Sequence, residues 1–165
     1  MSAEAFFAPL RPYIQAFDAW AHAATPPVRA DHVGYRCASA QEFEELRAAF
    51  ETESRFLYQS MISQRRIAVI GLRDPIHTTL GPIAILELAD QKPDGSQVSG
   101  FDHIEMYPIA GTVEALVEHC ATTGTPFQKT VRPHHTTYDA VLKDTFKIRL
   151  ENESLIEKIK KDEMT

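Results

Sequence analysis

Two histidines stand in nearly the same local sequence, and they are the first sign of chemistry in this chain. Asp31-His32-Val33 and Asp102-His103-Ile104 each open a stretch that is predicted to form a strand. In the second stretch His103, Glu105 and Tyr107 share one parity, and an alternation of period two is typical of a strand. The duplicated opening indicates a duplicated structural unit, with one imidazole in each copy.

Each copy also offers a glutamate near the end of its last expected strand. Glu87 lies in the apolar run 82–88, where a carboxylate is costly to bury unless it is paired or bound to a cation. Glu151 ends a strand in which charged and apolar residues alternate. Two imidazoles and two carboxylates suit one divalent ion of Zn, Ni, Fe, Mn or Co. A single histidine on a strand is more often an ordinary hydrogen-bonded residue, so it is the repetition that favours a metal site.

The elements that must position these residues repeat in the same order. We expect a helix over 3–24, complicated by two prolines, then a strand at 31–37, a helix capped by Ser39, and strands at 55–62, 65–73 and 82–88. A polar connector at 91–96 leads to a strand at 101–107, a helix from Thr112 to Gly124, strands at 126–133, 136–143 and 145–151, and a charged C-terminal helix. Strand, helix and three strands therefore occur twice.

The length of 165 residues suits one compact domain. We expect residues 1–165 to form a single domain, with an N-terminal helix at 1–27, a first module at 28–90, a second at 100–152 and a C-terminal helix at 153–165. The first helix is expected to pack on the domain, and the alternative is a dimerisation helix. The sequence leaves both a monomer and a homodimer open.

The composition of the chain excludes several classes of binding partner. The net charge of −6 argues against nucleic acid and against an anionic membrane surface. No apolar run is long enough to span a bilayer, and the first residues lack the basic start of a signal peptide. Cys37 and Cys120 have no motif spacing and are expected to be reduced core residues. We therefore expect a cytoplasmic protein whose partner is a small molecule.

Strand parity adds charged residues to the face that carries the histidines. Arg36 and Arg149 are expected to point there and to hold the carboxylate or phosphate of an anionic ligand. Glu105 is two residues after His103 and is a candidate general base or an orienting partner of a ligand. The alternative for this set is a group of solvated strand residues and internal ion pairs. His134 and His135 mark a candidate entrance, for which an ordinary surface loop is the alternative.

These features together resemble the vicinal-oxygen-chelate superfamily, which includes glyoxalase I, methylmalonyl-CoA epimerase, extradiol dioxygenases and bleomycin-resistance proteins. More narrowly, the chain resembles the bacterial YecM family, described as candidate metal-binding proteins. The stretches that carry this resemblance are Asp31-His32-Val33-x-x-Arg36-Cys37, Met61-Ile62 with Arg66-Ile67, Leu86-Glu87-Leu88, and Asp102-His103-Ile104-Glu105. The resemblance runs from about residue 28 to the C-terminal helix.

The resemblance implies an α+β fold in which two tandem βαβββ modules form an eight-stranded, cup-shaped mixed sheet. It implies one divalent metal at the centre, held by His32, Glu87, His103 and Glu151. The implied activity is that of a metal-dependent isomerase or lyase acting on a small, anionic, oxygen-rich molecule, with Glu105 and Glu151 as the carboxylates that move a proton. The alternatives are a non-catalytic binding protein and an extradiol-type dioxygenase. A cup filled by its own side chains would favour the binding protein.

Overall fold

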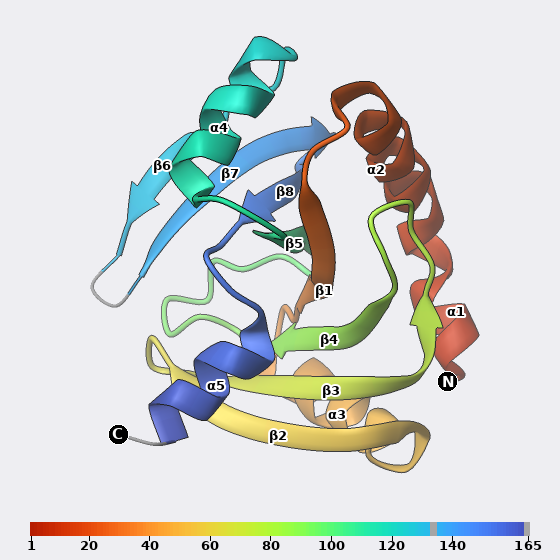
Figure 1. Cartoon of the computed structure of the whole chain (residues 1–165). Helices are drawn as coiled ribbons and strands as arrows, with labels where there is room; N and C mark the ends of the chain where they lie inside the picture. Colours follow the sequence, from red (N-terminus) through yellow and green to blue (C-terminus); the bar gives the residue numbers. More distant parts are fainter. Residues whose placement is uncertain (133–134, 164–165) are drawn as a thin grey trace.

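The chain folds into one eight-stranded mixed sheet with helices on both faces (Figure 1). The computed structural model describes residues 1–132 and 135–163, the last two of them by their backbone alone. Across the sheet the strands follow the order β2-β3-β4-β1-β5-β8-β7-β6. The strands are β1 (Val28–Arg36), β2 (Ser54–Ile62), β3 (Arg65–Ile76), β4 (Ile83–Ala89), β5 (Gly100–Pro108), β6 (Gln128–Val131), β7 (Thr136–Lys143) and β8 (Phe146–Leu150). The helices are α1 (Ala3–Phe7), η1 (Ala8–Leu10), α2 (Arg11–Ala24), α3 (Ala40–Glu53), α4 (Val113–Thr122) and α5 (Leu155–Glu163).

The expected repeat is present in the order of elements and in the pairing of strands. β1 pairs with β4 in parallel, β5 pairs with β8 in parallel, and β1 and β5 pair with each other in antiparallel fashion at the centre of the sheet. The α+β fold with two βαβββ units and additional terminal helices is therefore confirmed. The expected first helix is divided in three, because Pro9 lies in the short 3₁₀ segment between α1 and α2.

Local sequence explains where the two central helices begin. The Ser39 hydroxyl accepts a hydrogen bond from the Glu42 amide at the start of α3. The Thr112 hydroxyl accepts one from the Ala115 amide at the start of α4. Each cap satisfies one of the amide groups that the first turn of a helix leaves without a partner.

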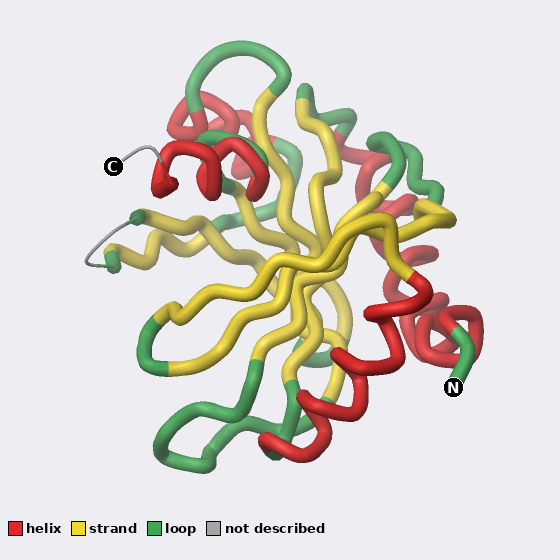
Figure 2. Tube along the Cα trace, turned by 90° about the horizontal axis from the view of Figure 1, so that it is seen from below, coloured by secondary structure: helices red, strands yellow, loops and turns green. Residues whose placement is uncertain are grey.

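The main core lies between the sheet and helices α1 to α4. Phe6, Leu10 and Phe17 from the N-terminal helices, Phe43 from α3 and Leu116 from α4 are buried in it. They pack on strand residues of one parity, namely Val33, Ala68, Ile70, Leu86, Leu88, Ile104, Met106, Phe146, Ile148 and Leu150. Viewed from below, the strands fill the middle of the molecule and the helices lie around them (Figure 2).

The other face of the sheet is the concave side, and of the helices in the described part of the chain only α5 lies on it. Ile67, Val69 and Ile85 have the opposite parity to the main core, and they form a smaller buried cluster with Leu155 of α5. The C-terminal helix therefore occupies the half of the cup that β3 and β4 form (Figure 1). Among the described residues, no helix is long and apolar enough to cross a membrane.

Candidate metal centre

The two Asp-His pairs lie at matching irregularities of the central strands. Between Ala30 and His32 the pairing of β1 with β5 shifts by one residue, which leaves Asp31 unpaired. A second shift leaves Asp102 unpaired on β5. Neighbouring side chains on a regular strand point to opposite faces, and a bulge removes that constraint. This is why each aspartate can reach the imidazole that follows it.

Each aspartate bonds to one ring nitrogen and leaves the other ring nitrogen facing the cup. His32 Nδ1 lies 2.7 Å from Asp31 Oδ2, and His103 Nδ1 lies 2.9 Å from Asp102 Oδ2. The two rings are close to perpendicular, with their centroids 5.6 Å apart. A carboxylate on Nδ1 fixes the orientation of an imidazole and makes Nε2 a better metal ligand.

Both Nε2 atoms are buried without a hydrogen-bond partner. Among the described residues only three buried side-chain polar atoms lack one: these two nitrogens and the Thr137 hydroxyl oxygen. A buried polar atom without a partner costs on the order of 1–3 kcal/mol, so native proteins rarely retain one without a role. The two atoms that would ligate an ion are thus the ones that the protein itself leaves unsatisfied.

Glu87 completes a compact group with the two histidines. Ligand atoms of His32, Glu87 and His103 all lie within 4.8 Å of one another. The Glu87 Oε2 atom is 3.8 Å from His32 Nε2. Three of the four residues predicted to bind the metal therefore converge on one point.

Glu105 lies on the other side of His32 and is held by a lysine from α5. Its Oε2 atom is 3.6 Å from His32 Nε2, and its Oε1 atom accepts a hydrogen bond from Lys158 Nζ at 2.7 Å. Burial alone would raise the pKa of Glu105, but His32 and Lys158 outweigh it and lower this pKa to about 2. For His32 burial has the opposite effect and lowers the pKa. The charge of Glu105 and the hydrogen bond to Asp31 outweigh burial and raise the pKa of His32 to about 9. The metal-free centre therefore holds a protonated His32 beside an ionised Glu105.

Glu151 is buried in the same half of the cup, but it is in neither group of candidate ligands. Its Oε1 atom lies 3.8 Å from Lys158 Nζ and 4.0 Å from Nε2 of the more exposed His135. Burial raises the pKa of Glu151. His135 therefore does reach the rim of this region, whereas His134 lies outside the described residues.

The sequence suggests that Glu87 and Glu151 occupy equivalent positions in the two modules, but the strand register does not support this. Gly34 is opposite Glu87 in the first module, and Glu105 is opposite Arg149 in the second. Arg149, not Glu151, therefore occupies the position in the second module that Glu87 occupies in the first. Its guanidinium is paired with Asp139, with Nε 2.6 Å from Oδ1.

The position two residues after each histidine makes the centre asymmetric. In the second module it is Glu105, opposite His32, and in the first it is Gly34, opposite His103. The side of His32 is closed by Glu105 and Lys158, whereas the side of His103 opens into a cavity of about 190 Å³. Arg36 and Arg149, predicted to bind substrate, both line this cavity.

Similarity to known proteins identifies the family of this chain. The sequence profile of the YecM family, described as YecM protein, matches residues 6–161. The chain belongs to the YecM family. Protein YecM of Escherichia coli (strain K12) is 30% identical over 90 residues, which is 54% of this chain and 47% of the relative, so the match spans about half of the relative's length.

One solved structure shows the same fold as this chain. The structure described as "Structural Genomics, Protein EC4020" has a TM-score of 0.72 to this chain at 22% identity, and the match covers 94% of this chain and 90% of that one. The fosfomycin resistance protein FosX of Listeria monocytogenes aligns over 78% of this chain and 94% of its own, at 11% identity and a TM-score of 0.29, which is too low to bear on function.

Several residues of this YecM family member were not identified from the sequence. The Asp-His repeat was visible, but alternation assigns each aspartate to the opposite face from its histidine. Lys158 lies on a charged helix with two other lysines and carries no local signal. Gly34 falls at an unspecified position of the motif that begins at Asp31. Only the register of β1 and β5 reveals what it does.

We predict that Gly34→Ala displaces His103 and weakens divalent metal binding by at least about tenfold. A Cβ atom on Gly34 would lie 2.4 Å from His103 Cε1, inside van der Waals contact on a buried central strand. Titration with Mn²⁺ or Ni²⁺ measures the effect. The matched control is Gly71→Ala, where the atoms nearest to the added Cβ belong to the exposed Phe56 ring and not to a histidine. Equal affinity of wild type and Gly34→Ala would show that His103 does not need its present position.

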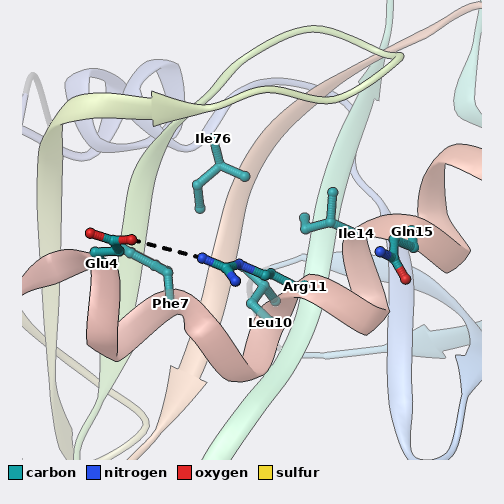
Figure 3. Close-up of a pocket in the computed structure, with 7 residues that line it drawn as sticks. All are labelled: Glu4, Phe7, Leu10, Arg11, Ile14, Gln15 and Ile76. Carbon is teal, nitrogen blue, oxygen red and sulfur yellow. Dashed lines mark ion pairs between the residues drawn. The ribbon is translucent and has the colours of Figure 1, made fainter.

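A second hollow lies on the outside of the molecule and has a different character. It has a volume of about 310 Å³ and is lined by α1, η1, α2 and Ile76 of β3 (Figure 3). Its two charged lining residues, Glu4 and Arg11, face each other at 3.9 Å and are both largely exposed. The remaining lining residues are Phe7, Leu10, Ile14, Gln15 and Ile76. None of the seven is a histidine or cysteine, so this hollow offers no imidazole or thiolate ligand for a metal.

Proposed function

We propose that this chain binds one divalent metal ion through His32, Glu87 and His103. The observation that carries the proposal is the pair of buried Nε2 atoms without a hydrogen-bond partner, within reach of one carboxylate. Two imidazoles and a carboxylate suit Zn²⁺, Fe²⁺, Mn²⁺, Co²⁺ or Ni²⁺ and leave coordination positions open. Membership of the YecM family and a cup-shaped sheet of this topology support the same reading.

The charges of the centre support a cation as well. Glu87 and Glu105 lie 3.8 and 3.6 Å from His32 Nε2, and in the metal-free protein a proton on His32 and the ammonium group of Lys158 offset their charges. A divalent ion would replace that proton and add one further positive charge. Asp31 and Asp102 would keep the two rings in place while this happens.

We further propose an isomerase or lyase that acts on a small oxygen-rich molecule. The metal would supply Lewis-acid stabilisation of negative charge on the substrate oxygens. Of the two predicted catalytic carboxylates, Glu151 is the better proton acceptor, because burial raises its pKa toward neutrality. Glu105, with a pKa lowered to about 2, fits a charge partner of His32 and Lys158.

The set of candidate metal ligands also favours a second candidate function. Two histidines and one glutamate match the two-histidine, one-carboxylate set of non-haem Fe²⁺ oxygenases. Tight, selective binding of Fe²⁺ and consumption of O₂ with a catechol-type substrate would support this dioxygenase alternative. Equal use of Zn²⁺ or Mn²⁺ without O₂ would support the isomerase or lyase.

Metal analysis of the purified protein tests the proposal. We expect about one equivalent of divalent metal after incubation with Zn²⁺, Mn²⁺ or Ni²⁺ and gel filtration, measured by inductively coupled plasma mass spectrometry. Protein that retains none of these ions would overturn the proposal.

The affinity for the metal should rise with pH. Because the pKa of His32 is raised to about 9 in the metal-free protein, His32 is protonated at neutral pH and must lose that proton to bind an ion. The pKa of His103 is lowered by burial and by Arg149, so His103 is already neutral there. We expect the association constant to increase about tenfold per pH unit from neutral pH to about pH 9, with about one proton released per ion. Mn²⁺ calorimetry in buffers of different ionisation enthalpy measures both quantities, and a pH-independent affinity would contradict a protonated His32.

A further inference from the structure

The cavity beside His103 gathers positive charge in an acidic protein. Six of the 17 lysines and arginines of the chain line it: Arg36, Arg65, Lys92, Arg132, Lys147 and Arg149. The acidic residues in its lining are Glu87, Asp102 and Asp139, so six positive and three negative charges leave the cavity at +3. The whole chain carries −6. A concave, oppositely charged patch of this kind attracts anions.

The arginines predicted to hold an anion are already engaged. Arg36 Nη2 lies 2.9 Å from Asp102 Oδ1, and Arg149 is paired with Asp139. Both aspartates and both arginines are largely buried, so these pairs form part of the wall. They shape the cavity and orient His103 through Asp102, but their charges are balanced.

The other four cations are not held in ion pairs of this kind with the described carboxylates. Among the described residues, no carboxylate lies within ion-pair distance of Arg65, Lys92, Arg132 or Lys147. Arg65 Nη1 donates to the side-chain carbonyl of Gln97, which is neutral. Burial lowers the pKa of Arg65; the charges of Glu87 and Asp102 oppose this shift, and those of Arg36 and Arg132 add to it. Arg65 and Lys147 are half-buried, and Lys92 and Arg132 lie at the exposed rim.

We propose that this cavity binds a small ligand with a doubly charged oxyanion group, of the phosphate, phosphonate or dicarboxylate type, between Arg65 and Lys147. The site lies next to His103 and Glu87, so the other end of the ligand reaches the metal centre. This inference rests on the proposed function for the orientation of the ligand, whereas the anion site itself consists of residues outside the ligand set. A guanidinium fork and an ammonium group together suit a multiply charged group better than a single carboxylate.

Calorimetry on the full-length, metal-free protein tests the anion site without the metal. The probes are inorganic phosphate, methylphosphonate, malonate and, as a singly charged reference, acetate. We expect at least one of the dianions to bind about tenfold or more tightly than acetate, and Arg65→Gln and Lys147→Gln each to weaken that binding by about tenfold. Which dianion binds best distinguishes phosphoryl from dicarboxylate ligands. The matched control is Arg73→Gln, which removes the same charge from an exposed position at the other end of β3.

The outcomes separate this inference from the proposed function. Dianions that bind no better than acetate, or Arg65→Gln and Lys147→Gln proteins that bind like the wild type, would overturn the anion site. An equal loss in Arg73→Gln would do the same, because it would reduce the effect to net charge. Metal content measured in parallel should stay at the wild-type value in all three variants. Loss of metal binding by the wild type with intact dianion binding would instead refute only the metal centre.

Discussion

His103→Ala protein should bind divalent metal at least about a hundredfold more weakly than wild type and should still fold. The substitution removes one of the two buried Nε2 atoms that lack a partner. In the metal-free protein that atom contributes no hydrogen bond, and Asp102 keeps its contact with Arg36 at 2.9 Å. We therefore expect the free energy of unfolding of the metal-free protein to fall by only about 1–2 kcal/mol, mainly from the lost packing of the ring.

His32→Ala should lose the metal to the same extent but destabilise the metal-free protein more. His32 is protonated there and faces Asp31, Glu87 and Glu105. Removing one partner of a buried charge pair leaves the other uncompensated and costs roughly 3–5 kcal/mol. The two histidines are equivalent by repeat, so this difference between them reports the asymmetric environment that Glu105 and Lys158 create.

Metal content by mass spectrometry and urea unfolding without metal measure the two effects separately. The exposed His77→Ala is the matched control, and it should change neither quantity. Stoichiometric metal in His103→Ala would refute the proposed ligand set. Equal unfolding free energies for the two metal-free variants would refute the protonated state assigned to His32.

Lys158→Met should lower the stability of the metal-free protein by roughly 2–4 kcal/mol. Lys158 Nζ lies 2.7 Å from Glu105 Oε1 and 3.8 Å from Glu151 Oε1, and both carboxylates are almost fully buried. Methionine keeps the length of the side chain and most of its packing, so the change isolates the charge. Without the ammonium group, the buried carboxylates of Glu105 and Glu151 lose the cation that lies between them. Glu151, whose pKa is already raised, is then the group expected to take up a proton.

The neighbouring Lys160→Met is the control for this change. It removes the same group from the same helix, but Lys160 is exposed, and its one ion-pair partner among the described side chains is the exposed Glu157. Its effect on the free energy of unfolding should stay within about 0.5 kcal/mol. Urea unfolding of both variants at neutral pH provides the comparison. Similar stabilities for the two would mean that α5 is held on the sheet by Leu155 and its apolar neighbours alone.

The C-terminal helix therefore has two roles in one element. Its apolar residues cover the concave face of β3 and β4, and Lys158 supplies the charge that Glu105 needs. Its first amide, that of Leu155, also donates to Asp31 Oδ2 at 2.9 Å. The same aspartate thus orients His32 and anchors the helix. Half of the cup is filled by α5, and the basic cavity gives a ligand access to the centre from the side of His103.

The sequence by itself determined the elements and the two faces of the sheet. Hydroxyl caps at Ser39 and Thr112 and the alternation in β8 are local signals, because a cap depends on three neighbouring residues and a strand face depends on every second one. The repeat of Asp-His was enough to indicate that His32 and His103 belong to one centre. Glu87 could be added because a carboxylate in an apolar run needs a cation.

The tertiary structure alone decided which further residues join these three at the centre and which do not. The register of β1 with β5 creates the bulges at Asp31 and Asp102 and sets Gly34 against His103. The register of β5 with β8 puts Arg149 where the first module has Glu87, and the docking of α5 brings Lys158 to Glu105 from 53 residues away. Register depends on contacts between strands that are distant in the chain, and a shift of one residue reverses every side chain. No local pattern in the sequence contains that information.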